Sequence, residues 1–506
     1  MRVASQEHFS TTHLTADLGG RSVRGGTVMI AAQGVKFILQ LGSLMVLARL
    51  LTPADFGLVA MVTAITGFAV MFKDAGLSMA TVQRAEINHA QVSTLFWINV
   101  GLSIVFMGLT AALAPTIAWF YGKPELTWIA LSLAGTFIFG GLTIQHQALL
   151  RRQMRFTALA ITSVASMASG IAAAVTAAVL GAGYWALVLM PATSAVTNTI
   201  LVWLLCHWRP GLPRRGTDIR SMLAFGGNLT CCNFLNYLTR NADKMLVGWA
   251  WGAGPVGLYT KAYSLLMLPI HQINAPISGV VIPSLSRLKD DAERYRAYYM
   301  KAILLMTAVG MPLTAFALTA ADDLVLAIFG EQWIEAVPIF RALAPAAFLG
   351  TFNVAAGWVY ASQGRADRQL RWGVIATPAN IVAFLVGLPF GAIGVAIAFS
   401  SAQAILRLPA LVYCFKGTPL RLADVGSVIW RPTLASISAA AGLLLFEGLG
   451  VYPGHIALDI GRQAGIFGCC YLVAWLALPG GARHISDTFH LIRMARPGLL
   501  SEPRLL

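Results

Sequence analysis

Long apolar runs follow one another along almost the whole chain, and short polar connections separate them. An α-helix needs roughly 17–25 mostly apolar residues to cross the hydrocarbon core of a membrane. The pattern therefore predicts an all-α polytopic membrane protein with about 14 transmembrane helices. The expected spans are residues 27–48, 56–72, 92–114, 126–146, 157–180, 184–206, 222–249, 257–282, 300–321, 336–359, 372–390, 392–414, 428–449 and 463–479.

The first twelve of these spans form two sets whose sequences repeat each other. Gly57 returns as Gly257 at an offset of 200 residues, and residues 152–156 return as residues 368–372 at an offset of 216. Duplicated halves are common in membrane transporters. We therefore predict two pseudo-symmetric six-helix lobes, related by an axis along the membrane normal, followed by two C-terminal helices.

The predicted organisation has six parts. They are a cytoplasmic N-terminal segment, an N-lobe, a cytoplasmic linker, a C-lobe, a C-terminal helix pair and a cytoplasmic tail. In chain order these are residues 1–26, 27–206, 207–221, 222–414, 415–480 and 481–506.

Composition and charge agree with a membrane protein whose basic loops lie on one side. Hydrophobic residues make up 57% of the chain and charged residues 11%, whereas soluble domains have about 25% charged residues. In the expected topology, 28 of the 36 Lys and Arg residues, Arg407 among them, lie with the loops on one side. Basic loops stay in the cytoplasm. The net charge of +15 therefore indicates cytoplasmic termini rather than a nucleic-acid partner, and the first 26 residues show no signal peptide.

The sequence contains no motif that would support catalysis. It lacks a phosphate-binding Gly-Lys-Ser/Thr loop, a metal-spaced His-Glu pair and a serine elbow, which are the signatures of the corresponding enzymes. We therefore expect no enzyme, no cofactor and no metal site. The six cysteines lie in or beside apolar runs, and we interpret them as packing residues.

Two expected spans carry polar stripes at equivalent positions of the repeat. A charge at the bilayer centre costs roughly 2.5–3.5 kcal/mol, so an intramembrane charge suggests function. The spacing of these residues places them on one helical face, and we predict that the stripes face each other across a water-filled cavity. The expected substrate-binding residues are Lys36, Arg240, Gln33, Gln40, Asn233, Asn236, Tyr237, Asp243, Lys244 and Lys261.

Structural alternatives exist for some of these charges. Arg240 and Asp243 are three residues apart and are able to neutralise each other. Lys244 and Lys261 lie near span ends, where long side chains reach the membrane interface.

Several connections resemble those of a known family. Residues 48–58, Ala-Arg-Leu-Leu-Thr-Pro-Ala-Asp-Phe-Gly-Leu, resemble the first outer loop of Wzx-type polysaccharide flippases. Residues 241–244 and 257–259 are also similar to that family, and residues 360–365, Tyr-Ala-Ser-Gln-Gly-Arg, resemble its inner loop after the tenth span. This branch of the multidrug/oligosaccharidyl-lipid/polysaccharide superfamily exports colanic acid, teichuronic acid, xanthan and related exopolysaccharides.

The resemblance implies two six-helix lobes around a central cavity, in a protein of the bacterial inner membrane. It also implies alternating access that moves undecaprenyl-diphosphate-linked oligosaccharides from the cytoplasmic to the outer leaflet. The expected partners are this lipid-linked oligosaccharide, membrane lipid and, as a further candidate, the polymerase and export machinery. Lys36 and Arg240 suit an anionic diphosphate, and the basic residues of 151–155 and 368–371 are candidates for collecting the head group.

Three alternatives stay open at this point. The first is a drug or organic-cation antiporter of the same superfamily, which would favour carboxylates in the cavity. The second is the lipid II flippase branch, which also has a cationic cavity. The third is a membrane glycosyltransferase or polymerase, which the short outer connections disfavour.

Overall fold

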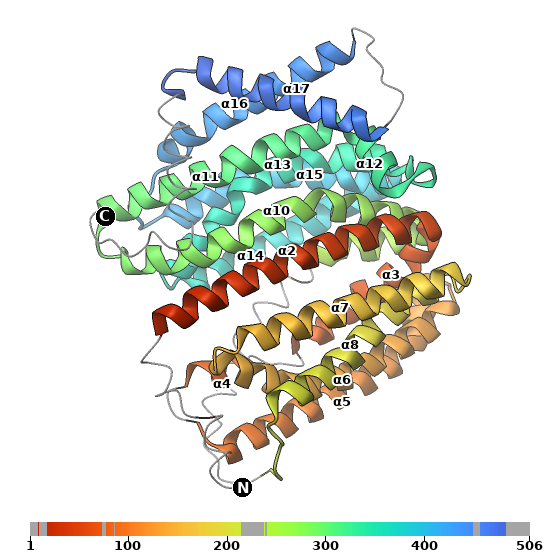
Figure 1. Ribbon diagram of the computed structural model, residues 1–506. Coiled ribbons are helices and arrows are strands. Elements are labelled where there is room, and N and C mark those ends of the chain that lie inside the picture. Colours follow the sequence, from red (N-terminus) through yellow and green to blue (C-terminus); the bar gives the residue numbers. More distant parts are fainter. Residues whose placement is uncertain are drawn as a thin grey trace. The chain divides into compact units, whose positions relative to one another are not determined.

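The computed structural model describes residue 9, residues 18–72, 77–84, 87–213 and 237, and residues 240–448 and 456–481. Within these ranges the regular elements are helices and no strand occurs, which confirms the all-α prediction (Figure 1). The chain divides into two compact units, unit 1 (residues 1–257) and unit 2 (residues 258–506).

Unit 1 is a bundle in which neighbouring helices along the chain pack together. Helix α5 packs on α6, α6 and α7 pack on α8, and α2 lies along α7. A further helix spans residues 240–251. The other helices are α2 (Leu18–Leu50), α3 (Pro53–Phe72), α4 (Leu77–Gln83), α5 (His89–Tyr121), α6 (Glu125–Arg152), α7 (Phe156–Val179) and α8 (Trp185–Cys206).

Unit 2 is a second helical bundle. Helix α11 packs on α13 and α16, α15 packs on α13 and α14, and α17 packs on α16. Helix α10 (Ala253–Arg287) begins in unit 1 and continues into unit 2. The remaining elements are α11 (Ala292–Thr319), α12 (Ala321–Phe329), η2 (Glu331–Trp333), α13 (Ala336–Ser362), α14 (Ala366–Gly387), η3 (Leu388–Phe390), α15 (Gly391–Phe415), α16 (Leu422–Glu447) and α17 (Ile456–Ala477).

The helices coincide with the expected spans, except that the seventh span is described only at residue 237 and from residue 240 onward. In the described part of the chain, ten helical stretches are long and apolar enough to cross a membrane, with residues 366–415 taken as one. Helix α10 makes an eleventh and bends by 44° between Asn274 and Pro276, because proline removes a helical hydrogen bond. The full count of fourteen spans stays a prediction, and the short helices α4 and α12 were not expected.

The sequence of the loop before α3 explains where this helix begins. The Thr52 backbone N–H and hydroxyl donate to the Asp55 carboxylate over 2.9 and 2.7 Å, and the Asp55 N–H donates to the Thr52 hydroxyl over 3.3 Å. This reciprocal arrangement caps the first turn, and Pro53 occupies the first helical position, where no N–H is needed.

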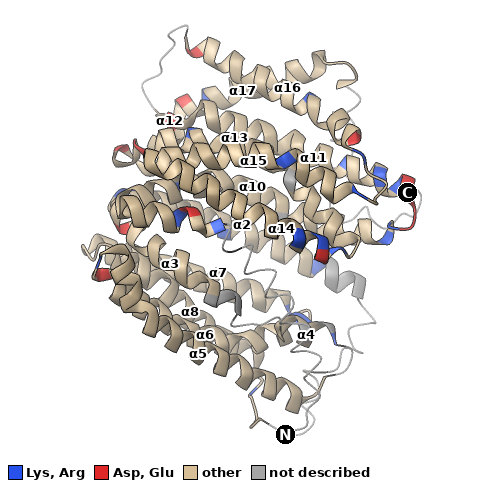
Figure 2. Cartoon of the chain, turned by 180° about the vertical axis from the view of Figure 1, so that it is seen from behind, with Lys and Arg blue, Asp and Glu red and all other residues tan. Residues whose placement is uncertain are grey.

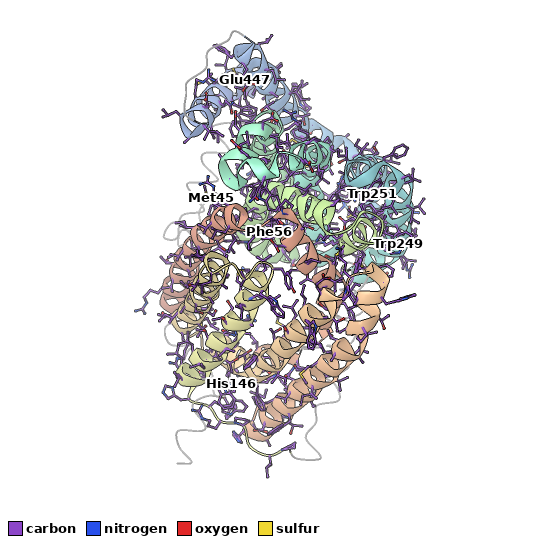
Figure 3. All side chains as sticks on the ribbon, turned by 90° about the vertical axis from the view of Figure 1, so that its right-hand side faces the viewer. Met45, Phe56, His146, Trp249, Trp251 and Glu447 are labelled. Carbon is purple, nitrogen blue, oxygen red and sulfur yellow. The ribbon has the colours of Figure 1, made fainter. Side chains whose placement is uncertain are left out.

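The distribution of polar and aromatic side chains follows that of a membrane protein. Charged residues gather at the ends and connections of the helices in each unit (Figure 2). In unit 1, exposed tryptophans mark one end of α5, α6 and the helix of residues 240–251, where Phe120 stacks on Trp249 (Figure 3). Tryptophan is enriched where helices leave the hydrocarbon. These residues are Trp119, Trp128, Trp249 and Trp251.

Two equivalent glycines of the repeat meet in unit 1. A Cβ atom built on Gly57 of α3 would lie 1.7 Å from the Ala253 carbonyl oxygen, and one built on Gly257 of α10 would lie 1.8 Å from the Pro53 carbonyl oxygen. Residues 53 and 253 are separated by the same 200 positions as residues 57 and 257. The backbones therefore cross reciprocally, and only glycine permits this approach.

Candidate functional site

The predicted polar stripe of the first span lies on α2, a helix that its neighbours cover poorly. Gln33, Lys36, Gln40 and Ser43 follow a spacing of three, four and three residues, which is one face of an α-helix. Only 11% of the most apolar stretch of α2 is buried, against 39% for α6. Gln33 and Gln40 are exposed, and Lys36 and Ser43 are half-buried.

Lys36 is a cation in the middle of an apolar helix. No acidic residue occurs in α2. Among the residues that the structure describes, Lys36 makes no ion pair and no hydrogen bond through its ammonium group.

A pocket of about 280 Å³ adjoins the C-terminal half of this stripe. Gln40 and Ser43 of α2 line it together with residues of α7 and α8. Helices α7 and α8 approach closely because Gly170 has no side chain; a Cβ there would lie 2.4 Å from Ser194 Oγ and 2.5 Å from the Met190 carbonyl oxygen. The other lining residues are Ser166, Met167, Ile171, Met190, Pro191 and Ser194.

The described part of the seventh span is attached to α3 in unit 1. The Tyr237 hydroxyl contacts the carbonyl oxygens of Thr63 and Ala64 at 2.7 and 3.0 Å, to which it donates its proton. Gly67 makes room for this contact, since a Cβ there would lie 2.3 Å from the hydroxyl oxygen. Tyr237, which the sequence predicts as a cavity residue, therefore holds this helix in place.

The remaining predicted residues of the seventh span differ in exposure and in whether their side chains already have a hydrogen-bond partner. Arg240 is exposed and makes no ion pair with Asp243 in the described part of the chain, although the two are three residues apart. Asp243 is buried and accepts a hydrogen bond from the Lys244 backbone N–H over 2.8 Å. The Lys244 ammonium donates to Asn241 Oδ1 over 3.0 Å.

Three predicted residues are not described as part of this site. Asn233 and Asn236 lie outside the described residues. Lys261 is half-buried in the part of α10 that belongs to unit 2.

The basic connections that the sequence places inside the cell have structural roles that were not predicted. Arg152 is buried and donates to the carbonyl oxygens of Phe9, Thr81 and Arg84. These groups include the C-terminal end of α4, where a cation is favourable. The prediction that Arg152 collects a head group is therefore wrong, because its guanidinium is enclosed and already bonded.

Corresponding connections in both units hold the end of the sixth helix of their set. In unit 1, Arg155 donates to the Leu205 carbonyl oxygen over 3.0 Å, near the end of α8. In unit 2, Arg365 donates to the Lys416 carbonyl oxygen over 3.0 Å, just after α15, and Arg368 donates to the same oxygen. Arg155 and Arg365 each directly precede the next helix, α7 and α14, and lie 210 residues apart. The offset of 216 between residues 152–156 and 368–372 is therefore wrong, because Arg152 ends α6 whereas Arg368 lies within α14.

Arg407 was assigned to the inner loops, and that assignment is wrong. Arg407 lies within α15, is 6% exposed and stands over the Phe352 ring at 5.6 Å from its centroid. It donates to Gln403 over 3.4 Å, and Gln403 in turn donates to Asn380 over 3.0 Å. The signal was present in the sequence, because an arginine inside an apolar run is an intramembrane charge.

A buried histidine in unit 1 also escaped the sequence analysis. His146 of α6 is 0% exposed, and its ring stacks on Trp203 at a centroid distance of 4.5 Å (Figure 3). The preceding Gln145 accepts from Thr81 and donates to Asn99, each over 2.8 Å. The signal was present here too, because Asn99, Gln145 and His146 are polar residues inside expected apolar spans.

Comparisons with known proteins agree with this architecture. A sequence model of the family described as polysaccharide biosynthesis protein matches residues 46–338. Lipopolysaccharide biosynthesis protein WzxC of Escherichia coli (strain K12) is 27% identical over 374 residues, covering 72% of this chain and 75% of the relative. Teichuronic acid biosynthesis protein TuaB of Bacillus subtilis (strain 168) is 27% identical over 451 residues, covering 86% and 91%.

The fold is similar to that of a solved membrane protein. The lipid II flippase MurJ in an inward closed conformation superposes with a TM-score of 0.71, at 14% sequence identity. The match covers 88% of this chain and 98% of that structure. At this level of identity the similarity identifies the fold.

Proposed function

Because the chain belongs to the polysaccharide biosynthesis protein family, we propose that it moves an oligosaccharide linked to undecaprenyl diphosphate across the bacterial inner membrane. In this proposal the chain is a flippase that works by alternating access. The lipid-diphosphate head group binds to cations on the polar stripes of α2 and of the seventh span.

The observation that carries the proposal is the exposed stripe on α2. Hydrocarbon offers no hydrogen bonds, so exposed amides and an ammonium group in a membrane span are costly wherever lipid covers them. Water or a polar ligand removes that cost. A cationic, amide-bearing stripe on a poorly covered membrane helix therefore fits a polar substrate that passes along α2.

The chemistry of the stripe favours an anionic substrate. Lys36 supplies a point charge and Arg240 a planar fork of donors, and both suit phosphate oxygens. Helix α2 has no carboxylate, whereas an antiporter for organic cations would need one near its ligand. The names of WzxC and TuaB connect those relatives with lipopolysaccharide and teichuronic acid biosynthesis, which supports a saccharide substrate for this chain.

The test replaces Lys36 and Arg240, the cations of the two polar stripes that have no hydrogen-bond or ion-pair partner in the described part of the chain. Lys36→Ala and Arg240→Ala should each abolish or strongly reduce polymer export while the protein stays in the membrane. The loss of one charge-assisted hydrogen bond is worth roughly 1.5–3 kcal/mol. Cells with either variant should accumulate lipid-linked oligosaccharide on the cytoplasmic side, and Arg240→Lys should restore part of the export.

Arg151→Ala is the comparison variant, because Arg151 is an exposed cation at the end of α6 that makes no hydrogen bond or ion pair in the described part of the chain. Its effect on export should be much milder than that of Lys36→Ala or Arg240→Ala. Wild-type polymer yield from both Lys36→Ala and Arg240→Ala would refute the proposal. Transport of lipid II in preference to a polysaccharide precursor would instead place the chain with lipid II flippases.

A further inference from the structure

The pocket beside the α2 stripe is lined by four polar and four apolar residues, none of which is charged. Its polar groups are the Gln40 amide and the hydroxyls of Ser43, Ser166 and Ser194. Its apolar groups come from Met167, Ile171, Met190 and Pro191. A phosphate would meet no cation on this lining, and a cation would meet no carboxylate.

The hydrogen-bonding capacity of the pocket is only partly used. The Ser194 hydroxyl donates to the Ser166 carbonyl oxygen over 2.6 Å, and the Ser166 hydroxyl donates to the Ser163 carbonyl oxygen over 3.3 Å. Both serine oxygens keep lone pairs that accept hydrogen bonds. The Gln40 amide and the Ser43 hydroxyl are bonded to no other described residue, so they offer donors and acceptors to a ligand.

This combination fits a neutral sugar better than a lipid chain. The hydroxyls of a sugar ring pair with amide and hydroxyl groups, and its C–H faces pack on apolar side chains. A hydrocarbon chain would leave the polar groups of the pocket without partners, which is unfavourable. The volume of about 280 Å³ lies just below the range of roughly 300–1,000 Å³ for small-molecule pockets, so a single ring is the appropriate size.

The position of the pocket relative to Lys36 supports the same ligand. Gln40 follows Lys36 by four residues on one helical face, a rise of about 6 Å at 1.5 Å per residue. In a lipid-linked oligosaccharide, the first sugar is joined to the diphosphate through one oxygen. A diphosphate bound to Lys36 therefore has its first sugar within reach of Gln40 and Ser43 when the glycan lies toward the C-terminal end of α2.

We propose that this pocket binds the first, neutral sugar of the lipid-linked oligosaccharide and contributes to the choice of glycan. The inference rests on the proposed function, since Lys36 must hold the diphosphate. In this proposal Lys36 binds the diphosphate, which all such lipids share. Gln40 and Ser43 bind the first sugar, which differs between glycans.

The experiment measures binding of defined lipids to the purified full-length protein in nanodiscs. The probes are undecaprenyl diphosphate and the same lipid carrying one glucose, galactose or N-acetylglucosamine. The wild-type protein should bind at least one glycosylated probe about tenfold more tightly than the bare diphosphate, the worth of one or two hydrogen bonds. Gln40→Leu combined with Ser43→Ala should remove this preference, so that the affinities of the glycosylated and the bare probe become equal in that variant.

Two controls separate the possible outcomes. Gly42→Ala lies on the same helix, where an added Cβ meets nothing within 4 Å, and it should bind every probe as the wild type does. Lys36→Ala should weaken binding of the bare and glycosylated probes alike. If the double variant keeps the sugar preference while Lys36→Ala lowers all affinities, the sugar pocket is refuted and the proposed function stands. Equal binding of bare diphosphate by Lys36→Ala and wild type would overturn both.

Discussion

The crossing of α3 and α10 at their repeated glycines allows a quantitative prediction. A Cβ on Gly57 would lie 1.7 Å from the Ala253 carbonyl oxygen, whereas ordinary contact begins at 3.4 Å. Gly57→Ala therefore requires these backbones to move apart by about 1.7 Å, because no flexible side chain is present to yield. Overpacking of this kind costs roughly 1–3 kcal/mol. If the transport cycle includes a state in which these helix ends separate, Gly57→Ala should shift the population toward it by roughly 5–150-fold.

The assay is a distance measurement between spin labels at residues 54 and 254, which flank the crossing on α3 and α10. Gly57→Ala should lengthen the distance distribution, and Gly257→Ala should do the same because the contact is reciprocal. The double variant should shift the distribution by less than the sum of the single shifts, since either change already opens the crossing. Gly279→Ala, on α10 with nothing within 4 Å of its added Cβ, is the control. The reasoning is wrong if Gly57→Ala matches that control both in distance and in polymer export.

Three further predictions concern stability and topology. Arg152→Ala should lower the unfolding free energy by roughly 1.5–3 kcal/mol, because buried carbonyl groups lose a charged donor. A melting temperature no lower than that of Arg151→Ala would contradict this role. Tyr237→Phe should lower the unfolding free energy by about 0.5–1.5 kcal/mol, because the hydroxyl contact with α3 is lost, and export should fall only as far as stability does. Lost export at unchanged stability would instead indicate that Tyr237 contacts the substrate. Reporter fusions after Arg215 and after Arg294 should both report a cytoplasmic location, and a periplasmic signal from either would overturn the expected topology.

The helices were predictable from the sequence because run length alone separates membrane spans from connections. Apolar runs long enough to cross a bilayer rarely occur outside membrane-spanning helices. Short helices such as α4 and α12 lie below that length, so the same criterion cannot detect them. The repeat identified Gly57 and Gly257 as equivalent positions. Equivalence in a repeat does not show how far apart two residues lie, and only the structure shows that these two positions meet.

The candidate site was predictable to the extent that it depends on one helix. Gln33, Lys36, Gln40 and Ser43 share a face of α2 because their spacing follows the helical period. The pocket beside Gln40 depends on the approach of α7 to α8, which no periodicity within α2 reveals. Similarly, Arg407 looked like one more inner cation, because its burial comes from α13 and α14 rather than from its own sequence neighbours.

The structure shows which basic residues already donate hydrogen bonds within the protein. Arg152, Arg155 and Arg368 donate to backbone carbonyl groups, so their charge stabilises helix ends, and a substrate would have to displace those bonds. The Lys36 ammonium and the Arg240 guanidinium have no such partner in the described part of the chain. A cation held by carbonyl groups and a cation open to solvent contribute equally to net charge and to the topology signal, yet only the second binds a phosphate without breaking an existing contact. Among the cations that lie within expected spans, availability, rather than number, therefore selects Lys36 and Arg240 as the charges to test first.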